Sequence, residues 1–489
     1  MRAISLVKKI EFEFTGNVAR NALTLGDVDN DGHNELVIGN DLGEVTIFKE
    51  RDKIQVISDL GFITCVSIGD ICNEGKNSLV IVTSDGWCYI YEVPYEISDT
   101  SVEEDTAIDC NVKEMADEVD GQGQSSSNVP TSTTTETHSS SESTFGQKKS
   151  SLKKDIDQKN PLVCVHTQRI PTNAKNMILG DVDGDGQIEM VLGLTDRVVR
   201  SYRFVKEPII TSREQVLGSL VALNKWECAK QIGSITLHRS LDNQPSILVS
   251  QPGGTFMRIK CQTDEPDEDN LSISNGSNSE AFPGSIDYQF LGISRMRNQN
   301  ISTEIIGDLM QSNDIEQEDQ NRYKNRPYAV ATLDGTIMLV QDEVILWAIA
   351  VDHQIFALTK LDVTGNGSDD IVVCSWDGQT YILDQEKNSV RFHLEEPVRA
   401  FHSGWYTLNV NQAPVTALVY VTFKNRVIIY YDIPLKHLIC KKFEPDLVEL
   451  SKLFVDKNTD SEQAIECMRR LDKKSKKNLV EYLLYEASC

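Results

Sequence analysis

The sequence predicts an all-β fold: a seven-bladed β-propeller that an N-terminal strand closes, followed by a short helical tail. Two observations predict this fold. An acidic loop between two apolar strands recurs four times, and its copies begin at Asp27, Asp70, Asp181 and Asp362. A tight turn, commonly Asp-Gly, then separates the second apolar strand from a third, which is typical of a β-hairpin. Repeated units of short antiparallel strands are typical of propeller blades.

The blades can be counted from the N-terminus. Residues 4–14 alternate apolar and polar side chains and predict a lone strand, which we expect to complete the last blade because a propeller must close its ring. The fourth unit lacks the acidic loop but keeps two strands around a Pro-Gly-Gly turn. Six or eight blades stay open, since the fourth and fifth units match the repeat weakly. Within a propeller of residues 1–434, the predicted blades are 16–56, 57–95, 161–208, 215–262, 286–343, 348–391 and 396–434.

Polar stretches interrupt the repeat. Residues 96–160 are rich in Ser, Thr, Asp and Glu, a composition that favours a disordered insert. Residues 263–285 and 310–326 are similarly polar and predict flexible loops. We expect these segments to be long loops on the ring and not linkers between domains.

After Pro434 the hydrophobic pattern changes from strand to helix, which predicts a helical tail over residues 435–489. Leu447, Leu450 and Phe454 fall on one helical face, and Thr459 begins a sequence that matches a capping box. The sequence leaves open whether this tail packs against the propeller, binds a partner as an amphipathic arm, or lies on a membrane surface.

The chain is strongly acidic, with 489 residues, a formal net charge of −26 and a pI of about 4.7. This charge opposes binding to nucleic acid or directly to anionic lipid, because both need clustered Lys and Arg. The 11 cysteines show no zinc-binding spacing and are typical of small core residues in a reducing compartment. Neither a signal-peptide pattern nor an apolar run near the roughly 20 residues of a membrane span is visible. We therefore expect a cytosolic protein.

The acidic loops carry the candidate metal ligands. Asp at alternate positions suggests oxygen ligands that converge on a hard cation such as calcium. An EF-hand is excluded because the twelfth position is Ile38, Leu192 or Val373 and strands follow, whereas that loop needs a Glu and flanking helices. A phosphatase-type nucleophile is disfavoured because the pattern recurs. The candidate ligands are Asp27, Asp29, Asp31 and Glu35 in the first loop and Asp181, Asp183, Asp185 and Glu189 in the second full loop.

The same loops are also compatible with a metal-free turn. Asp and Asn side chains bond to their own backbone, and Gly adopts positive φ. The decayed copy, which has Cys72 and Ser78 at ligand positions, must hold its shape in this way. Calcium sites of modest affinity would also stay empty in cytosol. We expect no required cofactor, and calcium in the two full loops stays open.

The sequence shows no arrangement typical of catalysis. No Ser/His/Asp or Cys/His pattern is visible, and the 8 histidines form no metal-ligand pair at i, i+2 or i, i+4 spacing. We therefore expect a non-catalytic interaction scaffold and not an enzyme. An enzyme that acts through the central channel stays open, and it would need carboxylates or metal ligands on the innermost strands.

Several strings go beyond a generic repeat. The acidic loops resemble FG-GAP repeats, the units of the integrin α-subunit propeller. Longer strings resemble the integrin-alpha FG-GAP repeat-containing protein 2 family, and the likeness covers residues 1–95 and 161–432. The insert 96–160 is longer than that family leads us to expect, and the tail matches weakly. The strings that carry the resemblance are residues 26–30, 69–73, 195–200, 249–253 and 351–382.

This resemblance implies a scaffold subunit of the KICSTOR complex on the lysosomal surface. Its implied role is to help recruit the GATOR complex to Rag GTPases, and so to restrain target-of-rapamycin signalling when amino acids or glucose are scarce. The implied partners are a kaptin-like propeller subunit, the seizure threshold 2 protein and the GATOR complex, with membrane association only through the complex. The alternative is an integrin-like, calcium-binding adhesion or ligand-binding propeller, which would be secreted.

Overall fold

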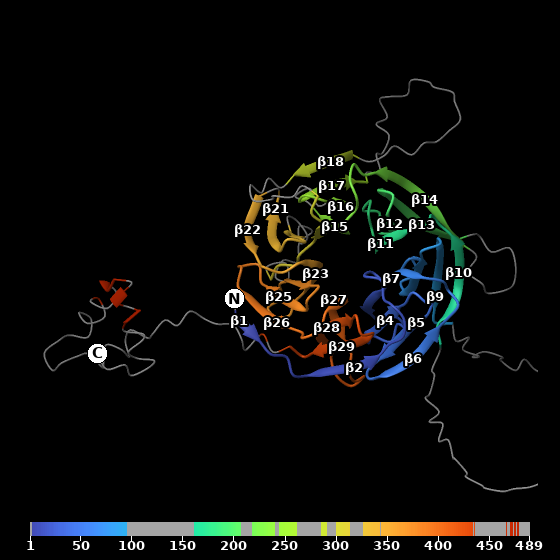
Figure 1. The fold of residues 1–489 in the computed structure, drawn as a ribbon. Helices are drawn as coiled ribbons and strands as arrows, with labels where there is room; N and C mark the ends of the chain where they lie inside the picture. The colour runs from blue at the N-terminus through green and yellow to red at the C-terminus, as the bar shows by residue number, and fades with distance from the viewer. Residues whose placement is uncertain are drawn as a thin grey trace, which may run out of the picture. The chain divides into compact units, whose positions relative to one another are not determined.

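A computed structural model of the protein describes residues 2–94, 161–206, 218–239, 244–261, 285–290, 300–312, 326–342 and 344–433, with residue 435 and scattered positions from 466 to 478. The described strands form seven sheets, which are the blades of a closed ring (Figure 1). The predicted seven-bladed β-propeller is therefore confirmed. Within the described ranges, no helix has the length and apolar character needed to cross a membrane.

Each blade contains four antiparallel strands, which lie side by side in order from the centre of the ring to its rim. Blade 1 comprises β3 (Leu23–Gly26), β4 (Glu35–Gly39), β5 (Val45–Lys49) and β6 (Asp52–Ile57). Blade 2 comprises β7 (Ile63–Gly69), β8 (Ser78–Thr83), β9 (Trp87–Glu92) and β10 (Val163–Arg169). Blade 3 comprises β11 (Ala174–Gly180), β12 (Glu189–Leu194), β13 (Val198–Lys206) and β14 (Gly218–Glu227).

The second half of the ring follows the same order. Blade 4 comprises β15 (Ile235–Arg239), β16 (Pro245–Gln251), β17 (Thr255–Lys260) and β18 (Ser285–Phe290). Blade 5 comprises β19 (Thr303–Ile306), β20 (Tyr328–Thr332), β21 (Thr336–Gln341) and β22 (Val344–Ala350). Blade 6 comprises β23 (Ile355–Leu361), β24 (Asp370–Ser375), β25 (Gln379–Leu383) and β26 (Ser389–His393). Blade 7 comprises β27 (Val398–Tyr406), β28 (Val415–Thr422), β29 (Arg426–Tyr431) and β2 (Lys9–Glu13).

The N-terminal strand closes the ring, as the sequence predicts. β2 pairs antiparallel with β29, and Lys9 lies opposite Tyr430. Phe12 on β2 also contacts Phe48 of blade 1, with 4.5 Å between the ring centroids. The outer strand of the last blade therefore comes from the opposite end of the chain.

A separate short strand, β1 (Arg2–Ile4), corrects the prediction of one lone strand over residues 4–14. β1 pairs in parallel with β26 and makes blade 6 a five-stranded sheet. Ile4 and Leu6 pack against the core that blades 6 and 7 share. The alternating pattern identifies strand residues, but it does not show where the chain crosses from one sheet edge to another.

The blade boundaries in the middle of the ring also differ from the prediction. The sequence places β10, β14 and β18 at the start of the units 161–208, 215–262 and 286–343, but each is the outer strand of the preceding blade. An apolar pattern reveals strands and not their partners, and intervening segments separate these strands from the ones they pair with. The insert 96–160 therefore interrupts blade 2 between β9 and β10 instead of separating two blades.

Several predicted segments fall on residues outside the described ranges. They are the insert 96–160, nearly all of the loop 263–285, most of the loop 310–326 and most of the tail 435–489. Within the tail, Leu435 belongs to the core of blades 6 and 7, and positions 466, 470, 474, 475, 477 and 478 are helical. The disorder, flexibility and helical structure expected of the rest stay predictions.

The second strand of a blade forms its most buried layer. Every residue of β4, β8, β12, β16, β20 and β24 is buried. Neighbouring blades cover both faces of these strands, which explains why their sequences are nearly continuous apolar runs. In blades 1, 2, 3 and 6 the acidic loop therefore leads into the most buried strand of the blade.

The apolar-Gly-Asp sequence before the acidic loops of blades 1, 2 and 3 has a packing reason. Gly26, Gly69 and Gly180 end the innermost strands of blades 1, 2 and 3, and each faces an apolar side chain of the next blade. At Gly180 an added Cβ would lie 2.3 Å from Leu237 Cδ1. These glycines allow neighbouring blades to approach each other near the centre of the ring.

Candidate functional site

The acidic loops of blades 1, 2, 3 and 6 share one backbone-bonded geometry. In the first loop Asp27 accepts hydrogen bonds from the backbone N–H groups of Asp31 and Gly32, at 3.1 and 2.9 Å. Gly32 has a φ of +85°, which Gly adopts without strain. The first Asp therefore caps its own loop. Equivalent bonds within their loops are accepted by Asp70, Asp181 and Asp362.

A buried carboxylate on the following strand closes the loop from the other side. Glu35 is 0% exposed and accepts a hydrogen bond from the backbone N–H of Val28 at 3.0 Å. Glu189 of blade 3 and Asp370 of blade 6 accept the same bond within their loops, at 3.0 and 2.9 Å. Such a carboxylate needs donors and a counter-charge, because burial penalises its ionised form.

In blade 1 the counter-charge comes from the chain itself. Lys49, the last residue of β5, places Nζ 2.5 Å from Asp29, 2.7 Å from Asp31 and 2.9 Å from Glu35. Burial raises the pKa of Glu35 to about 8. Burial alone would lower the pKa of Lys49, but its hydrogen bonds to carboxylates outweigh burial and raise that pKa. The ammonium group of Lys49 therefore contacts three of the four candidate calcium ligands of this loop.

Blade 3 repeats this arrangement with an arginine. Arg203 lies opposite Glu189 on the neighbouring strand. Its guanidinium nitrogens lie 3.1 Å from Asp183, 2.8 Å from Asp185 and 2.5 Å from Glu189. Burial opposes the charge of Arg203, but the carboxylates outweigh burial and raise the pKa. The two full loops therefore hold a lysine and an arginine in the same role.

Blades 2 and 6 balance the negative charge of their acidic loops in other ways. In blade 2 a serine, Ser78, replaces the buried carboxylate, and its Oγ donates a hydrogen bond to Glu92 at 2.8 Å. Glu92 ends β9, as Lys49 ends β5 in blade 1. In blade 6 no Lys or Arg among the described residues pairs with Asp370, and burial raises the pKa of Asp370 to about 7. The loops thus keep one backbone geometry with three different charge arrangements.

The loops also join neighbouring blades. Asn30 of the first loop and Asn77 of the second exchange two hydrogen bonds, of 2.9 and 2.7 Å. Asn73 of the second loop accepts a hydrogen bond from the backbone N–H of Ile188 in the third at 2.7 Å. These bonds make the loops braces between blades, independently of any ligand.

We expect the substitution Asp370→Asn to remove part of the pH dependence of stability. In the unfolded chain an Asp titrates near pH 4, so between about pH 4 and pH 7 the folded chain keeps a proton that the unfolded chain has lost. Stability therefore falls as pH rises through this window, by up to about 4 kcal/mol. The uncharged Asn can accept the same backbone hydrogen bonds, so the variant should gain stability relative to wild type as pH rises.

Urea denaturation at pH 4.5 and pH 7 measures this difference. The exposed carboxylate Asp352 provides the control, since Asp352→Asn should keep the wild-type pH dependence. Equal pH dependence in wild type and Asp370→Asn would show that Asp370 ionises as an ordinary aspartate.

The structure brings together most of the predicted metal ligands. One oxygen each of Asp27, Asp29 and Glu35 lies within 4.8 Å of the others, and Asp181, Asp183 and Glu189 form the same group. Asp31 and Asp185 complete the ion pairs with Lys49 and Arg203. These two cations were not among the predicted site residues. The sequence did contain a signal for them, because each cation follows the first Asp of its loop by the same number of residues.

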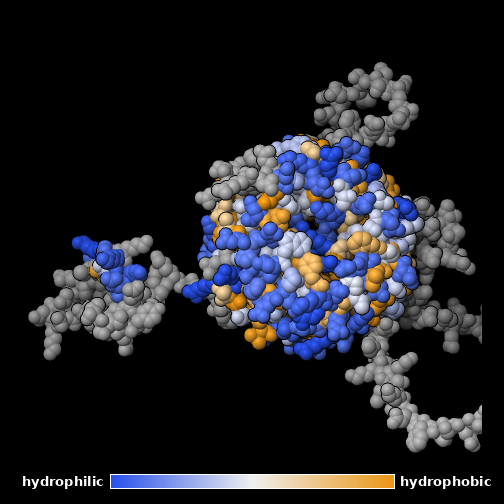
Figure 2. All heavy atoms as spheres, viewed as in Figure 1, coloured by the Kyte–Doolittle hydropathy of each residue, from blue (hydrophilic) through white to orange (hydrophobic). Residues whose placement is uncertain are grey.

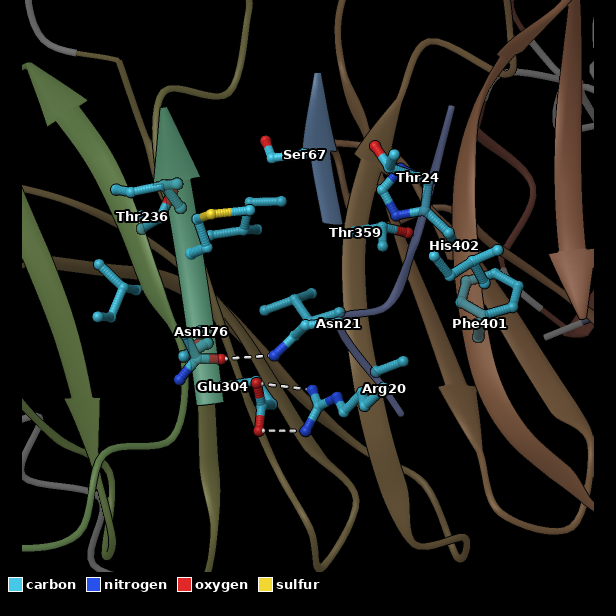
Figure 3. Close-up of a pocket in the computed structure, with 18 of the residues that line it drawn as sticks. Arg20, Asn21, Thr24, Ser67, Asn176, Thr236, Glu304, Thr359, Phe401 and His402 are labelled. Atoms are coloured by element: carbon cyan, nitrogen blue, oxygen red, sulfur yellow. Dashed lines mark hydrogen bonds and ion pairs between the residues drawn. The ribbon is translucent and has the colours of Figure 1, made fainter. Parts of the chain in front are cut away.

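A central channel is the second candidate site. A cavity of about 450 Å³ lies where the innermost strands of the blades meet. Arg20 forms a bidentate ion pair across it with Glu304 of blade 5, with N–O distances of 2.8 and 2.7 Å (Figure 3). Asn21 donates a hydrogen bond to Asn176 of blade 3 at 2.8 Å. These polar groups are bonded to one another across the ring.

The channel does not gather metal-ligating side chains. In the part of the chain that the structure describes, the groups of three or more such side chains lie in the two acidic loops. His402 lies in the channel wall, and burial lowers its pKa to about 4, so its imidazole is neutral at pH 7. Figure 2 shows a face of the ring on which hydrophilic residues predominate, with apolar residues among those beside the channel mouth.

Comparison with known proteins identifies relatives over nearly the whole propeller. A family model described as integrin-alpha FG-GAP repeat-containing protein 2 matches residues 49–435. A Mus musculus protein named "KICSTOR complex protein ITFG2" is 33% identical over 446 residues, which are 90% of this chain and 87% of that protein. The Bos taurus protein of the same name is 32% identical over 453 residues, which are 90% of this chain and 73% of that protein.

A solved structure supports the fold alone. The chain is similar to the crystal structure of BBS1N in complex with ARL6DN, with a TM-score of 0.51 and 12% sequence identity. The similarity covers 89% of this chain and 98% of that chain. At this identity the shared feature is the propeller, because one fold supports many unrelated functions.

Proposed function

The chain belongs to the integrin-alpha FG-GAP repeat-containing protein 2 family, as its repeat strings predict, and from this premise we propose that it is a non-catalytic scaffold subunit of the KICSTOR complex. The observation that carries the proposal is the name of the mouse and cattle relatives, which align with 90% of this chain. The proposed partners are a kaptin-like propeller subunit, the seizure threshold 2 protein and the GATOR complex.

The proposed consequence is negative regulation of target-of-rapamycin signalling. The complex would help to bring GATOR to Rag GTPases at the lysosome during amino-acid or glucose starvation, and this chain would reach the membrane only through the complex. A closed propeller supports a scaffold role because its rigid faces suit docking. The ion pair of Arg20 with Glu304 inside the channel also supports a docking role and not a catalytic one. A catalytic channel would need a free carboxylate, and Glu304 is paired with Arg20.

The acidic loops support a scaffold over an adhesion propeller that depends on calcium. Lys49 and Arg203 engage three carboxylates each in the two full loops. We propose that these side chains take the place of calcium, so that Asp27, Asp29, Asp31, Glu35, Asp181, Asp183, Asp185 and Glu189 brace the ring without a cofactor. The integrin-like alternative needs these ligands for a metal ion.

Affinity purification and a starvation assay test the proposed function together. The tagged chain, expressed in cells that lack the endogenous protein, should co-purify with the kaptin-like subunit. Cells without the chain should keep target-of-rapamycin signalling active during amino-acid starvation, and the tagged chain should restore silencing. An unrelated seven-bladed propeller with the same tag is the control for both measurements.

The two readouts separate membership from its consequence. Absence of the kaptin-like subunit from the purified material would reject membership of the complex. If that subunit co-purifies but starved knockout cells silence the kinase normally, membership stands and the assigned role in signalling is wrong.

A further inference from the structure

β22, the outer strand of blade 5, differs from the other strands at the rim of the ring. Its sequence, Val-Ile-Leu-Trp-Ala-Ile-Ala, contains no charged residue. The outer strands of the other blades, β2, β6, β10, β14, β18 and β26, each carry at least one Lys, Arg, Asp or Glu. Charges on an edge strand discourage other strands from pairing with it. β22 lacks this protection.

The strand is held firmly on one side and open on the other. Trp347 Nε1 donates a hydrogen bond to the backbone carbonyl of Gln385 at 2.8 Å, and Ile349 packs against the core of blades 5 and 6. Val344 and Leu346 are 63% and 47% exposed. Among the described strands, only β21 pairs with β22. Within the described ranges, β22 is therefore a fixed, apolar strand whose outer edge pairs with no other strand.

An open strand edge selects the kind of ligand that covers it. Its outward backbone N–H and C=O groups are matched by another extended backbone, and alternate side chains then set specificity. The neighbouring blade shows that the rim accepts a fifth strand, because β1 covers β26 there (Figure 1). Blade 5 offers the same kind of edge without a strand of its own among the described residues.

The charges around β22 indicate the chemistry of that ligand. The exposed carboxylates of Asp342 and Asp352 flank the strand at its two ends. A second copy of the chain would bring the same acidic flanks to an antiparallel pair, and the net charge of −26 opposes such a dimer. A segment with basic flanks would instead be attracted.

We propose that the outer edge of β22 binds an extended segment of a partner protein, with apolar side chains at alternate positions and Lys or Arg at both flanks. This inference does not depend on which complex contains the chain. Co-purification and starvation signalling test the proposed function, whereas direct binding of a defined peptide tests the edge of β22.

The probe is a fluorescent nonapeptide in which three valines alternate with two threonines between pairs of lysines. Its binding to the full-length chain is measured by fluorescence anisotropy. We expect it to bind at least tenfold more tightly than the same peptide with glutamates in place of the lysines. The substitution Leu346→Lys should weaken its binding at least tenfold, because a charge then occupies the apolar edge.

A matched control separates this site from general attraction to an acidic chain. Val56→Lys adds the same charge at a position that is 42% exposed on β6, the outer strand of blade 1, and should leave binding unchanged. Thermal melting of both variants should match wild type, and Val344→Lys provides a second position on β22. Equal weakening by Leu346→Lys and Val56→Lys would overturn the proposal.

Two further outcomes would assign the edge to another occupant and overturn the proposal. The first is a dimer in sedimentation velocity that Leu346→Lys converts to a monomer, which would make a second copy the ligand. The second concerns the chain's own Leu438-Ile439-Cys440, which lies between Lys436 and Lys441. If the amide hydrogens of β22 exchange slowly in wild type and fast in the variant Ile439→Asp, this segment of the chain is the ligand.

Discussion

Deletion of residues 1–14 is expected to abolish cooperative unfolding of the ring. The deletion removes β2 and leaves the edge of β29 unpaired. It also removes Phe12, which contacts Phe48 of blade 1, and the buried Phe14. Each hydrogen bond contributes about 0.5–1.5 kcal/mol, and each large apolar side chain about 1.5–3 kcal/mol when fully buried. Their sum is comparable to the roughly 5–15 kcal/mol that stabilises a typical protein.

Circular dichroism during thermal unfolding measures this effect. We expect the cooperative transition to disappear or its midpoint to fall by more than about 10 °C. Deletion of residues 1–7 is the matched control, because it removes β1 but keeps β2 against β29 and should cost less. A deletion of residues 1–14 that melts like wild type would reject closure by β2. Equal losses in both deletions would give the closing role to β1.

Substitution of Lys49 by alanine is expected to destabilise the protein by about 3–5 kcal/mol above pH 8, where Glu35 is ionised, because it leaves buried carboxylates without their cation. Glu35 is 0% exposed, and Lys49 is its charged partner at 2.9 Å. The exposed pair of Lys225 and Glu227 provides the control, with the same kind of contact at 2.7 Å. Lys225→Ala should leave the free energy of unfolding close to the wild-type value, because solvent screens an exposed ion pair. Urea denaturation measures both variants.

Calcium then distinguishes an internal cation from a displaced metal ion. Wild type should melt at the same temperature with millimolar calcium and with a chelator. In Lys49→Ala the three carboxylates are free to bind calcium, and 10 mM calcium should restore about 1.4–2.7 kcal/mol if the dissociation constant is about 0.1–1 mM. A wild-type melting temperature that rises with calcium and falls with chelator would show that the native loop binds calcium.

The local features of the fold could be predicted from the sequence, and the long-range ones could not. The acidic loops, the Asp-Gly turns and the buried second strands each depend on neighbouring residues, so their patterns are visible in a short window. The assignment of β10, β14 and β18 to a blade depends on pairing across long intervening segments. No periodicity within a strand contains that information.

In the candidate site, too, the local features could be predicted from the sequence and the long-range ones could not. The first Asp of each loop bonds within its own loop, as the turn interpretation predicts. Lys49 and Arg203 stand at the same spacing from the first Asp of their loops, but only the pairing of β5 with β4 shows that this spacing places Lys49 beside Glu35. The residue at that spacing in blade 6 is Asp384, so the lack of a cation there can be read from the sequence once the pairing is known.

Closure by the N-terminal strand also determines when the protein can fold. Lys8 and Asp432, which form an ion pair beside the closing strands, are 424 positions apart in the chain. A ribosome that adds about 5–20 residues per second needs roughly 20–85 s to cover this distance. β2 leaves the ribosome first and must wait for its partner throughout that time. Its alternating Lys9, Glu11 and Glu13 oppose aggregation during the wait. The ring can therefore close only after β29 (Arg426–Tyr431) has been synthesised.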